Sequence, residues 1–352
     1  MTNRLNKKPS VSRSRIFLQI LLVLLAFLLC VVTTVLILAA VGKKRLLRHQ
    51  GANITVPSNY VQAAENDGKN ITYNGERYQY NEKVTNILIM GIDRKKLSQT
   101  ASETYGANGQ ADVLFLVSLD TETGNMTVIP ISRDTMVDVD LYAADGQYLG
   151  VSNQQICLSF SYGDGRKKSC ENTCTAVSRL LYGMPIHSYL AIDLDAIRLL
   201  NDAISGVTVT VNEDIDLYSM HLKKGDTVTL KGSYALRYIR GRDQSLEANN
   251  VRMERQKNYA KAFYSQTIQM TKKDLTTPIR LYNRLGDYKV SNLGVADISF
   301  LTKCVLLNHK NDTVSFTTIP GDLSQGASYV ELRADKQALY KIVLDTFYTK
   351  IS

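Results

Sequence analysis

The sequence predicts an α/β domain with a central mixed β-sheet flanked by helices, preceded by one N-terminal transmembrane helix. Two observations predict this fold. Short apolar runs alternate with stretches of helical spacing over most of the chain, and an uncharged apolar segment lies near the N-terminus. At 352 residues the chain is long enough for an anchor and one large domain with a substantial core.

The apolar segment runs from Ile16 to Gly42 without a charged residue. It is longer than the roughly 20 residues with which an α-helix crosses a bilayer, and too long for a signal-peptide core of about 7 to 15 residues. We therefore interpret residues 16–42 as an uncleaved signal anchor behind a tail of residues 1–15. Five basic residues precede the segment and four follow it closely, so charge alone does not set its orientation.

The net charge of +9 does not indicate nucleic-acid binding once it is located in the chain. The first 50 residues hold nine Lys or Arg and no acidic residue, so the remainder carries 33 basic and 33 acidic side chains. The basic excess therefore flanks the apolar segment, and the rest of the chain is neutral.

Residues 43–80 are polar and weakly patterned, which is typical of a stalk, and we expect the domain to occupy residues 81–352. The domain opens with three apolar runs that predict strands, at 86–91, 112–119 and 126–131. The turn residues Asp120 to Asn125 join the last two runs, which predicts a hairpin.

Later in the chain the periodicity alternates between the two kinds of element. Helices are predicted at about 170–182, 193–204, 246–270, 296–308 and 334–349. Strands are predicted at 207–211, after Gly206, and at 313–319. Strands interleaved with helices in this way favour layers of helix around a mixed sheet.

Polar residues at the ends of the predicted strands are the first candidates for a site. Asp93 follows the opening strand and Asp112 starts the next, so that two carboxylates on neighbouring strand ends can hold Mg²⁺. The alternative is that both are ordinary turn and strand-start residues. Arg133 and Asp134 follow the third strand, where the arginine can bind phosphate and the aspartate can orient it, or where the two form a structural ion pair.

Arginines are densest near residues 237–256. Arg240 and Arg242 alternate, so in an extended segment they project to one side, and Arg252 and Gln256 share a face of the following helix. Together they form an anion site suited to a diphosphate, or a solvated basic patch.

The cysteines leave their pairing open. Cys170 and Cys174 lie on one helix face, where a mutual disulfide fits poorly, and Cys157 can pair with either of them outside the cell. No histidine accompanies them at zinc-site spacing.

Seven segments, taken in their order and spacing, resemble the LytR-CpsA-Psr phosphotransferases. They are NILIMGIDR, ADVLFLVSLD, VIPISRDT, GMPIHSYLAIDLDAI, SGVTVTV, YALRYIRGRD and RMERQ, and they span about residues 84–265. Each segment alone is weak evidence, whereas the set is specific.

The resemblance implies a single-pass cell-membrane protein with an extracellular C-terminal domain. Such an enzyme binds a polyprenyl diphosphate-linked glycan in an apolar groove, transfers the glycopolymer (teichoic acid, capsule or similar) to peptidoglycan, and releases polyprenyl phosphate. The family's metal-coordinating aspartates match Asp93 and Asp112, which would hold Mg²⁺ or Mn²⁺. Its remaining site residues match Arg133, Arg240, Arg242, Arg252 and Gln256.

Two departures from the family bear on activity. Gln110 stands where the family has an arginine, two residues before Asp112, and Arg94 is a candidate replacement for that diphosphate contact. The loop from Lys95 to Gly109 is longer than usual.

We expect catalysis to depend on Asp93, Asp112, Arg133 and Arg240, with either aspartate as proton acceptor. The alternatives are a non-catalytic protein that binds cell wall or lipid-linked glycan and acts in regulation, and a polyprenyl pyrophosphatase in which water replaces the glycan acceptor. The sequence leaves open which polymer is transferred and what oligomer forms.

Overall fold

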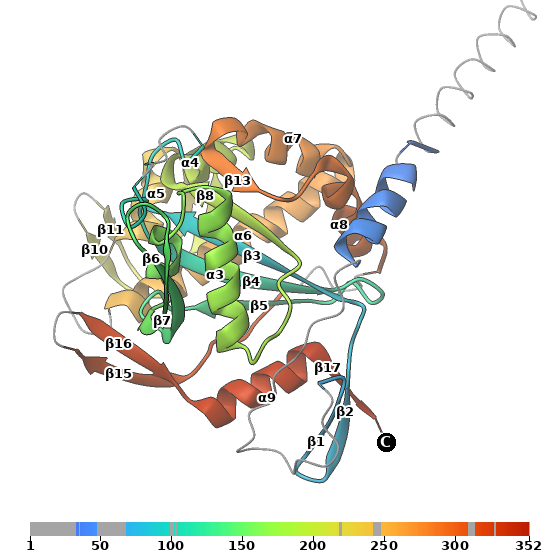
Figure 1. Cartoon of the computed structure of the whole chain (residues 1–352). Helices are drawn as coiled ribbons and strands as arrows, with labels where there is room; N and C mark the ends of the chain where they lie inside the picture. The colour runs from blue at the N-terminus through green and yellow to red at the C-terminus, as the bar shows by residue number, and fades with distance from the viewer. Residues whose placement is uncertain are drawn as a thin grey trace, which may run out of the picture.

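The computed structural model describes residues 33–34, 36–47, 68–98, 102, 104–217, 220–241, 248–308, 314–326 and 329–351. Its centre is a six-stranded mixed sheet in the order β13-β8-β3-β4-β5-β14 (Figure 1). The strands are β3 (Val84–Ile92), β4 (Ala111–Asp120), β5 (Met126–Ile131), β8 (Ser188–Asp193), β13 (Lys289–Ser291) and β14 (Ser315–Phe316). The predicted fold class of helices around a mixed sheet is therefore confirmed.

The sheet has an antiparallel core with parallel additions. β3 pairs antiparallel with β4, and β4 pairs antiparallel with β5. The turn between β4 and β5, which makes the predicted hairpin, is closed by a 2.9 Å hydrogen bond from the backbone NH of Asp120 to the carbonyl of Asn125. β8 pairs parallel with β3, and β14 pairs parallel with β5. Because β3 is an apolar run buried along nearly its whole length, it occupies the middle of the sheet.

Helices cover both faces of the sheet. The face formed by residues such as Leu88 and Leu116 packs on α3 (Lys167–Leu180) and α9 (Lys336–Phe347). The other face, near Ile87 and Leu119, packs on α6 (Ala248–Lys273) and α8 (Val295–Asn308). Along β4 the second face is less tightly covered, because Phe115 and its alternate neighbours are only partly buried.

A smaller layer flanks α6. The hairpin of β9 (Val207–Thr210) and β12 (Thr227–Leu230) packs with α4 (Leu194–Ala203) and α5 (Ser233–Arg240) in a separate apolar cluster. The remaining elements are α2 (Leu158–Ser161), α7 (Thr277–Arg284) and the hairpins β6–β7 (Met136–Tyr142, Tyr148–Gln155), β10–β11 (Ile215–Leu217, Met220–Leu222) and β15–β16 (Gly321–Gln325, Val330–Ala334).

Two expectations from the sequence differ from the structure. The segment around Arg240 was expected to be extended, and this is wrong: Ala235, Tyr238 and Ile239 recur at helical spacing, pack into the apolar cluster and make this segment α5. The predicted strand at 313–319 is reduced to β14, and residue 313 is outside the described part.

Residues 43–80 do not form a uniform stalk where the structure describes them. A helix continues through residues 36–46, which we call the N-terminal helix. β1 (Asn70–Tyr73) and β2 (Glu76–Tyr80) form a hairpin that pairs with the last strand, β17 (Tyr348–Ile351), so residues 70–80 belong to the domain.

Most of the expected anchor, residues 16–42, lies outside the described residues, as does the tail of residues 1–15. Within the described part, no helix has both the length and the hydropathy needed to cross a membrane. Membrane anchoring therefore stays a prediction from the sequence.

Candidate functional site

The two candidate aspartates lie at the same end of the sheet because β3 and β4 pair antiparallel, and a β-bulge accommodates the second of them. Gly91 pairs with Val113 while Ile92 pairs with Ala111, so Asp112 is the extra residue on β4. The Asp93 backbone NH donates to the carbonyl of Gln110 over 3.2 Å, which holds the residue after β3 beside the start of β4. The Asp93 side chain is 50% exposed and that of Asp112 is 18% exposed.

Arg133 joins this end of the sheet from the neighbouring strand β5. Its two terminal nitrogens donate to the side chains of Asp112 and Gln110, and Nη2 also lies 3.5 Å from Cys157 Sγ. Burial alone would lower the pKa of Arg133, but Cys157, Asp112 and Asp134 more than offset this and raise it. The guanidinium is therefore a fixed positive charge in a polar setting. The side-chain oxygen of Gln110, which stands where the resembled family has an arginine, accepts a hydrogen bond from Arg133. An arginine at position 110 would instead repel the Arg133 guanidinium.

Asp134 connects three parts of the site. It is buried, and its oxygens accept hydrogen bonds from Gln155, at the end of β7, over 2.9 Å and from Asn249, in the first turn of α6. One of its oxygens lies 3.7 Å from Nε of Arg133. Burial raises the pKa of Asp134, against the opposing effects of Asn249 and Arg133. Asp134 thereby orients Arg133 and fixes the start of α6 relative to the sheet.

Asp134→Asn is expected to flatten the pH dependence of stability. Because the pKa of Asp134 is raised in the folded state, the folded protein keeps a proton that the unfolded chain has lost. This contribution stabilises the fold at low pH and is lost as pH rises through the folded-state pKa. Urea unfolding between about pH 4 and pH 7 measures it, with Asp138→Asn, an exposed carboxylate on β6, as the control. Parallel curves for wild type and Asp134→Asn would contradict the assignment.

α6 brings the predicted pair Arg252 and Gln256 to the same cleft, as their spacing indicated. Both side chains are largely buried, and Gln256 Nε2 donates to the carbonyl of Ile239 over 3.1 Å. Arg255, to which the sequence analysis gave no role, donates to the carbonyls of Tyr238 and Gly241 and pairs with Glu213 at 2.9 Å. Arg255 thus connects the end of α5 to α6. This contact joins two separate segments, so the sequence pattern of either segment alone does not predict it.

Arg240 ends α5 beside the first aspartate. Its Nη2 lies 3.4 Å from Asp93 Oδ1, and both side chains are half exposed. This weak, solvated pair leaves Arg240 able to turn toward a ligand. Arg242, the other arginine of this segment, lies outside the described residues.

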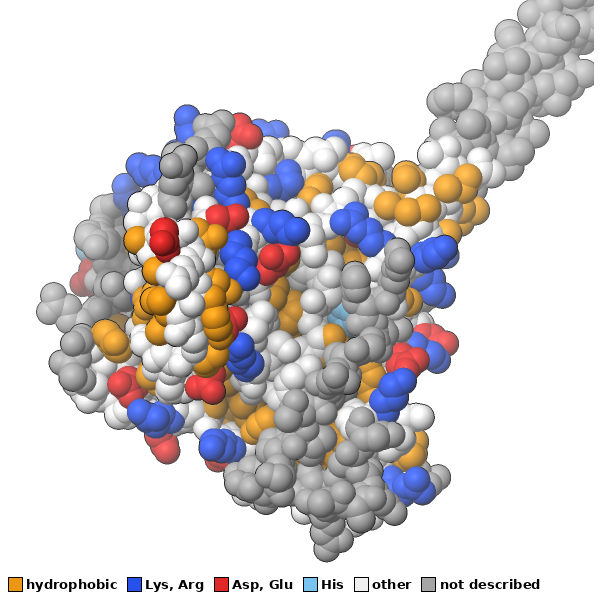
Figure 2. Space-filling view, viewed as in Figure 1, with side chains coloured by type: hydrophobic (Ala, Val, Ile, Leu, Met, Phe, Trp, Pro, Cys, Tyr) orange, Lys and Arg blue, Asp and Glu red, His pale blue; other side chains and the backbone are white. Residues whose placement is uncertain are grey.

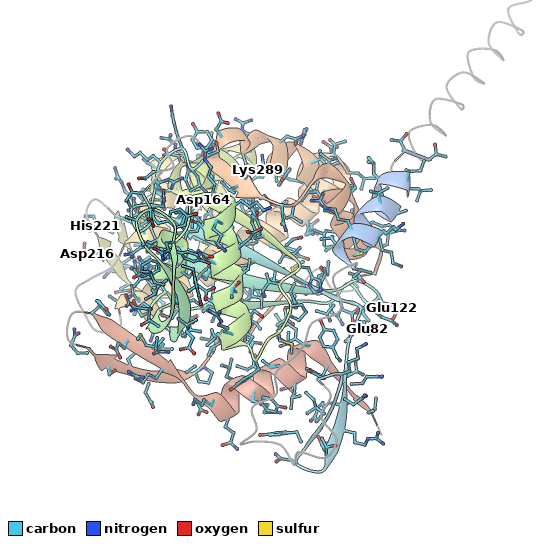
Figure 3. All side chains as sticks on the ribbon, in the orientation of Figure 1. Glu82, Glu122, Asp164, Asp216, His221 and Lys289 are labelled. Carbon is cyan, nitrogen blue, oxygen red and sulfur yellow. The ribbon has the colours of Figure 1, made fainter. Side chains whose placement is uncertain are left out.

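Arg94 has a different task from the one expected. Its guanidinium donates to the carbonyls of Asn108, Leu97 and Gly165, so it holds the long loop after β3 against the start of α3. Figure 3 labels Asp164, the neighbour of Gly165, at this end of α3. Burial lowers the pKa of Arg94. Because both terminal nitrogens are engaged by the loop and the remaining donor, Nε, is buried, the structure does not support Arg94 as the replacement cation for the diphosphate contact.

The four cysteines in the described residues are free, including Cys157, Cys170 and Cys174. Cys170 and Cys174 lie one turn apart on α3, as their spacing predicted. Cys157 is the one at the site, buried next to Arg133, and burial raises the pKa of its thiol to about 11. It is therefore a neutral packing group at physiological pH and not a nucleophile.

A narrow cleft joins Asp112, Arg133 and Arg252 to the less covered face of the sheet, and Asp93 and Arg240 are not among its lining residues. Its polar end is formed by Asp112, Arg133 and Arg252, and its apolar wall includes Phe115 and Met253. The cleft volume is about 10 Å³, close to the space that a single water occupies. A larger ligand therefore requires the side chains around the Arg133–Asp112 pair to move apart.

The aspartates fit a hard divalent cation that is shared with a phosphate ligand. Mg²⁺ at phosphate sites commonly takes one or two carboxylates and completes its shell with phosphate oxygens and water. Over the described ranges, no group of three or more His, Cys, Asp or Glu is placed to hold a metal ion. Asp93 and Asp112, at the same end of the sheet, are the residues that could hold such an ion together with a phosphate ligand.

Comparison with known proteins adds an independent line of evidence. A model of the LytR_cpsA_psr family matches residues 50–343. The teichoic acid–peptidoglycan transferase TagU of Oceanobacillus iheyensis is 27% identical over 184 residues, 52% of this chain and 52% of that protein. TagV of Bacillus subtilis is 29% identical over 188 residues, 51% of this chain and 43% of that protein. The alignments thus span about half the length of these curated relatives.

The fold recurs in a solved structure. The crystal structure of B. subtilis TagV aligns with 74% of this chain and 94% of its own, with a TM-score of 0.56 and 24% sequence identity. At this identity the likeness establishes the shared fold.

Proposed function

The chain belongs to the LytR-CpsA-Psr family, and from this premise we propose that it transfers a glycopolymer from a polyprenyl diphosphate carrier to peptidoglycan and releases polyprenyl phosphate. Its relatives TagU and TagV are named polyisoprenyl-teichoic acid–peptidoglycan teichoic acid transferases, which supports a teichoic acid as the polymer. We place the domain outside the cell, on the single-pass anchor that the sequence predicts.

The observation that carries this proposal is the two-sided character of the cleft. Arg133 and Arg252 line one end, and Phe115 and Met253 line the wall that leads along the less covered face of the sheet. A diphosphate with a hydrocarbon tail has the same division into an anionic and an apolar part. A soluble sugar phosphate has no hydrocarbon part to pack against the apolar wall, so a lipid-linked substrate matches this cleft better.

In the proposed reaction a hydroxyl oxygen of peptidoglycan attacks the phosphorus that bears the glycan. A new O–P bond forms, the P–O bond to the polyprenyl phosphate breaks, and the hydroxyl proton passes to a base. Asp93 suits the role of base, because it is half exposed and its side chain lies 3.4 Å from Arg240 in a weak, solvated pair, whereas Asp112 is engaged by Arg133.

The arginines supply the main stabilisation of the reacting charge. Asp112 and Asp134 hold Arg133 at the polar end of the cleft, so its positive charge is in place once the cleft has opened to admit the diphosphate. Arg240 can move toward the phosphate from its exposed position. A Mg²⁺ or Mn²⁺ ion held by Asp93 and Asp112, when bound, would supply further neutralisation of the diphosphate.

Release of polyprenyl phosphate tests the proposal. The full chain in detergent is incubated with a lipid diphosphate glycan and a soluble peptidoglycan fragment as acceptor, with Mg²⁺ or with a chelator, beside Asp112→Asn. The matched control is Asp140→Asn, because Asp140 also pairs with an arginine, Arg179 at 2.8 Å, away from the cleft. We expect Mg²⁺-dependent release that is lost in Asp112→Asn and kept in the control.

The other outcomes point to the alternatives. If the wild-type protein binds the substrate but releases no polyprenyl phosphate, the chain is a non-catalytic glycan-binding protein and not a transferase. Release that is equally fast without any peptidoglycan acceptor would indicate a pyrophosphatase.

A further inference from the structure

The N-terminal helix is docked on the domain through close backbone contact. Ala39 and Leu46 are buried, with 3% and 2% of their surface exposed, in the apolar cluster that contains Phe300 of α8. Gly42 lies between them, and a Cβ atom there would be 2.2 Å from the carbonyl oxygen of Ala296. Small residues that allow two helix backbones to meet are characteristic of helix pairs that pack tightly.

A charged contact secures the same junction. Arg45 Nη1 lies 3.1 Å from Asp297 Oδ2, and Arg45 Nη2 donates to the carbonyl of Asn292 over 2.5 Å. The Asp297 residue is fully buried and also accepts from the backbone NH of Gly294 over 2.7 Å. Because a buried carboxylate is costly without its partner, this pair favours one docked arrangement of the two helices.

The docked helices leave apolar side chains exposed. Leu36, Ile37 and Val41 on the N-terminal helix are 52%, 62% and 53% exposed, and Leu307 at the end of α8 is 72% exposed. Figure 2 shows hydrophobic side chains gathered on the N-terminal helix, with basic side chains nearby on the domain. The basic residues Lys43, Lys44 and Lys303 belong to these same two helices and are exposed.

We propose that the N-terminal helix and α8 form one membrane-contact surface, with Leu307 in the interfacial region of a bilayer that carries anionic lipids. This inference rests on the proposed membrane anchoring. The uncharged segment ends at Gly42, which lies against Ala296 and Phe300, so α8 runs past the level where the chain leaves the bilayer. Apolar side chains beside lysines are the composition with which helices bind an anionic interface.

The consequence for the proposed function is a fixed position of the site relative to the docked N-terminal helix. Ile87 of β3 packs in the cluster beneath α8, and Asp93 follows the far end of the same strand. At about 3.3 Å per residue the strand carries the site about 20 Å beyond that cluster. The docked junction thus holds the cleft at one distance from the N-terminal helix, which a loose stalk would not do.

A single-tryptophan experiment tests this surface. The chain has no Trp, so Leu307→Trp gives one reporter in the full protein. The protein is placed in vesicles of phosphatidylcholine and phosphatidylglycerol with brominated acyl chains, which quench nearby Trp emission. Leu149→Trp on β7 is the control, because Leu149 is also exposed, at 62%, but lies on a hairpin apart from α8 (Figure 1).

Relative to the same vesicles without bromine, we expect the emission of Leu307→Trp to fall about twofold or more, since interfacial side chains lie within reach of the acyl chains. The emission of Leu149→Trp should be the same in both kinds of vesicle. Gly42→Leu or Arg45→Ala, added to Leu307→Trp, should each reduce the quenching by undocking α8. Equal quenching of both reporters in a folded, membrane-inserted protein would overturn the proposal. The readout needs no turnover, so quenching in an inactive protein would uphold this surface and count against only the proposed reaction.

Discussion

Replacing Arg133 with alanine is expected to abolish transfer and to destabilise the domain. Loss of a prearranged donor at a developing charge typically lowers the rate by about 10²- to 10³-fold. The change also leaves the side chains of Asp112 and Gln110 without the donor that holds them, beside a buried Asp134. The free energy of unfolding should fall by about 2 kcal/mol, because partly buried polar groups lose their partner.

Two variants separate the causes of this effect. Arg133→Lys keeps the charge but replaces the planar guanidinium, whose two terminal nitrogens bind Asp112 and Gln110 separately, with a single ammonium nitrogen, so activity should stay low while part of the stability returns. Arg179→Ala removes an arginine that pairs with Asp140 at 2.8 Å outside the cleft, and it should leave the rate unchanged. Wild-type turnover by a folded Arg133→Ala protein would contradict the role given to Arg133.

Arg240→Ala is expected to lower activity without lowering stability. Arg240 is half exposed and makes one 3.4 Å contact with Asp93, an ion pair of the kind that contributes little to folding. Its role lies in contact with the substrate, so kcat/KM should drop about 10²-fold while the free energy of unfolding changes by less than about 0.5 kcal/mol.

Steady-state kinetics and urea unfolding on the same preparation measure both quantities. Arg237→Ala is the matched control, because Arg237 is an exposed arginine one turn earlier on α5, whereas Arg240 is the arginine that lies beside Asp93. If Arg240→Ala lost stability and activity in equal measure, Arg240 would be a structural residue. The contrast with Arg133, where both quantities should fall, distinguishes a prearranged charge from a mobile one.

The sequence was informative where the chemistry is local. Apolar runs that end in polar residues predicted β3, β4 and β5 and placed Asp93, Asp112 and Arg133 at strand ends. Helical spacing predicted that Arg252 and Gln256 share one side of α6, and both line the cleft. These features follow from period and turn chemistry, which a single segment contains.

What the sequence did not predict depends on contacts between distant segments. The bulge that accommodates Asp112 arises from pairing with β3, and the link from Asp134 to Asn249 joins residues 115 apart in the chain. The sequence suggested Arg94 as a substrate-binding cation, because it does not reveal that the loop folds its carbonyl groups around the Arg94 guanidinium. The polar composition after the apolar segment likewise indicated a stalk, because the pairing of β2 with β17, at the other end of the chain, has no local signature.

Formation of the glycan–peptidoglycan adduct is the most direct test of the central claim. The full chain is incubated with Mg²⁺, a polyprenyl diphosphate glycan and a soluble peptidoglycan fragment, and the products are identified by mass spectrometry. The account predicts one adduct joined by a phosphodiester for each polyprenyl phosphate released, and neither product with Arg133→Ala. Polyprenyl phosphate without adduct, or adduct formed equally well by Arg133→Ala, would contradict it.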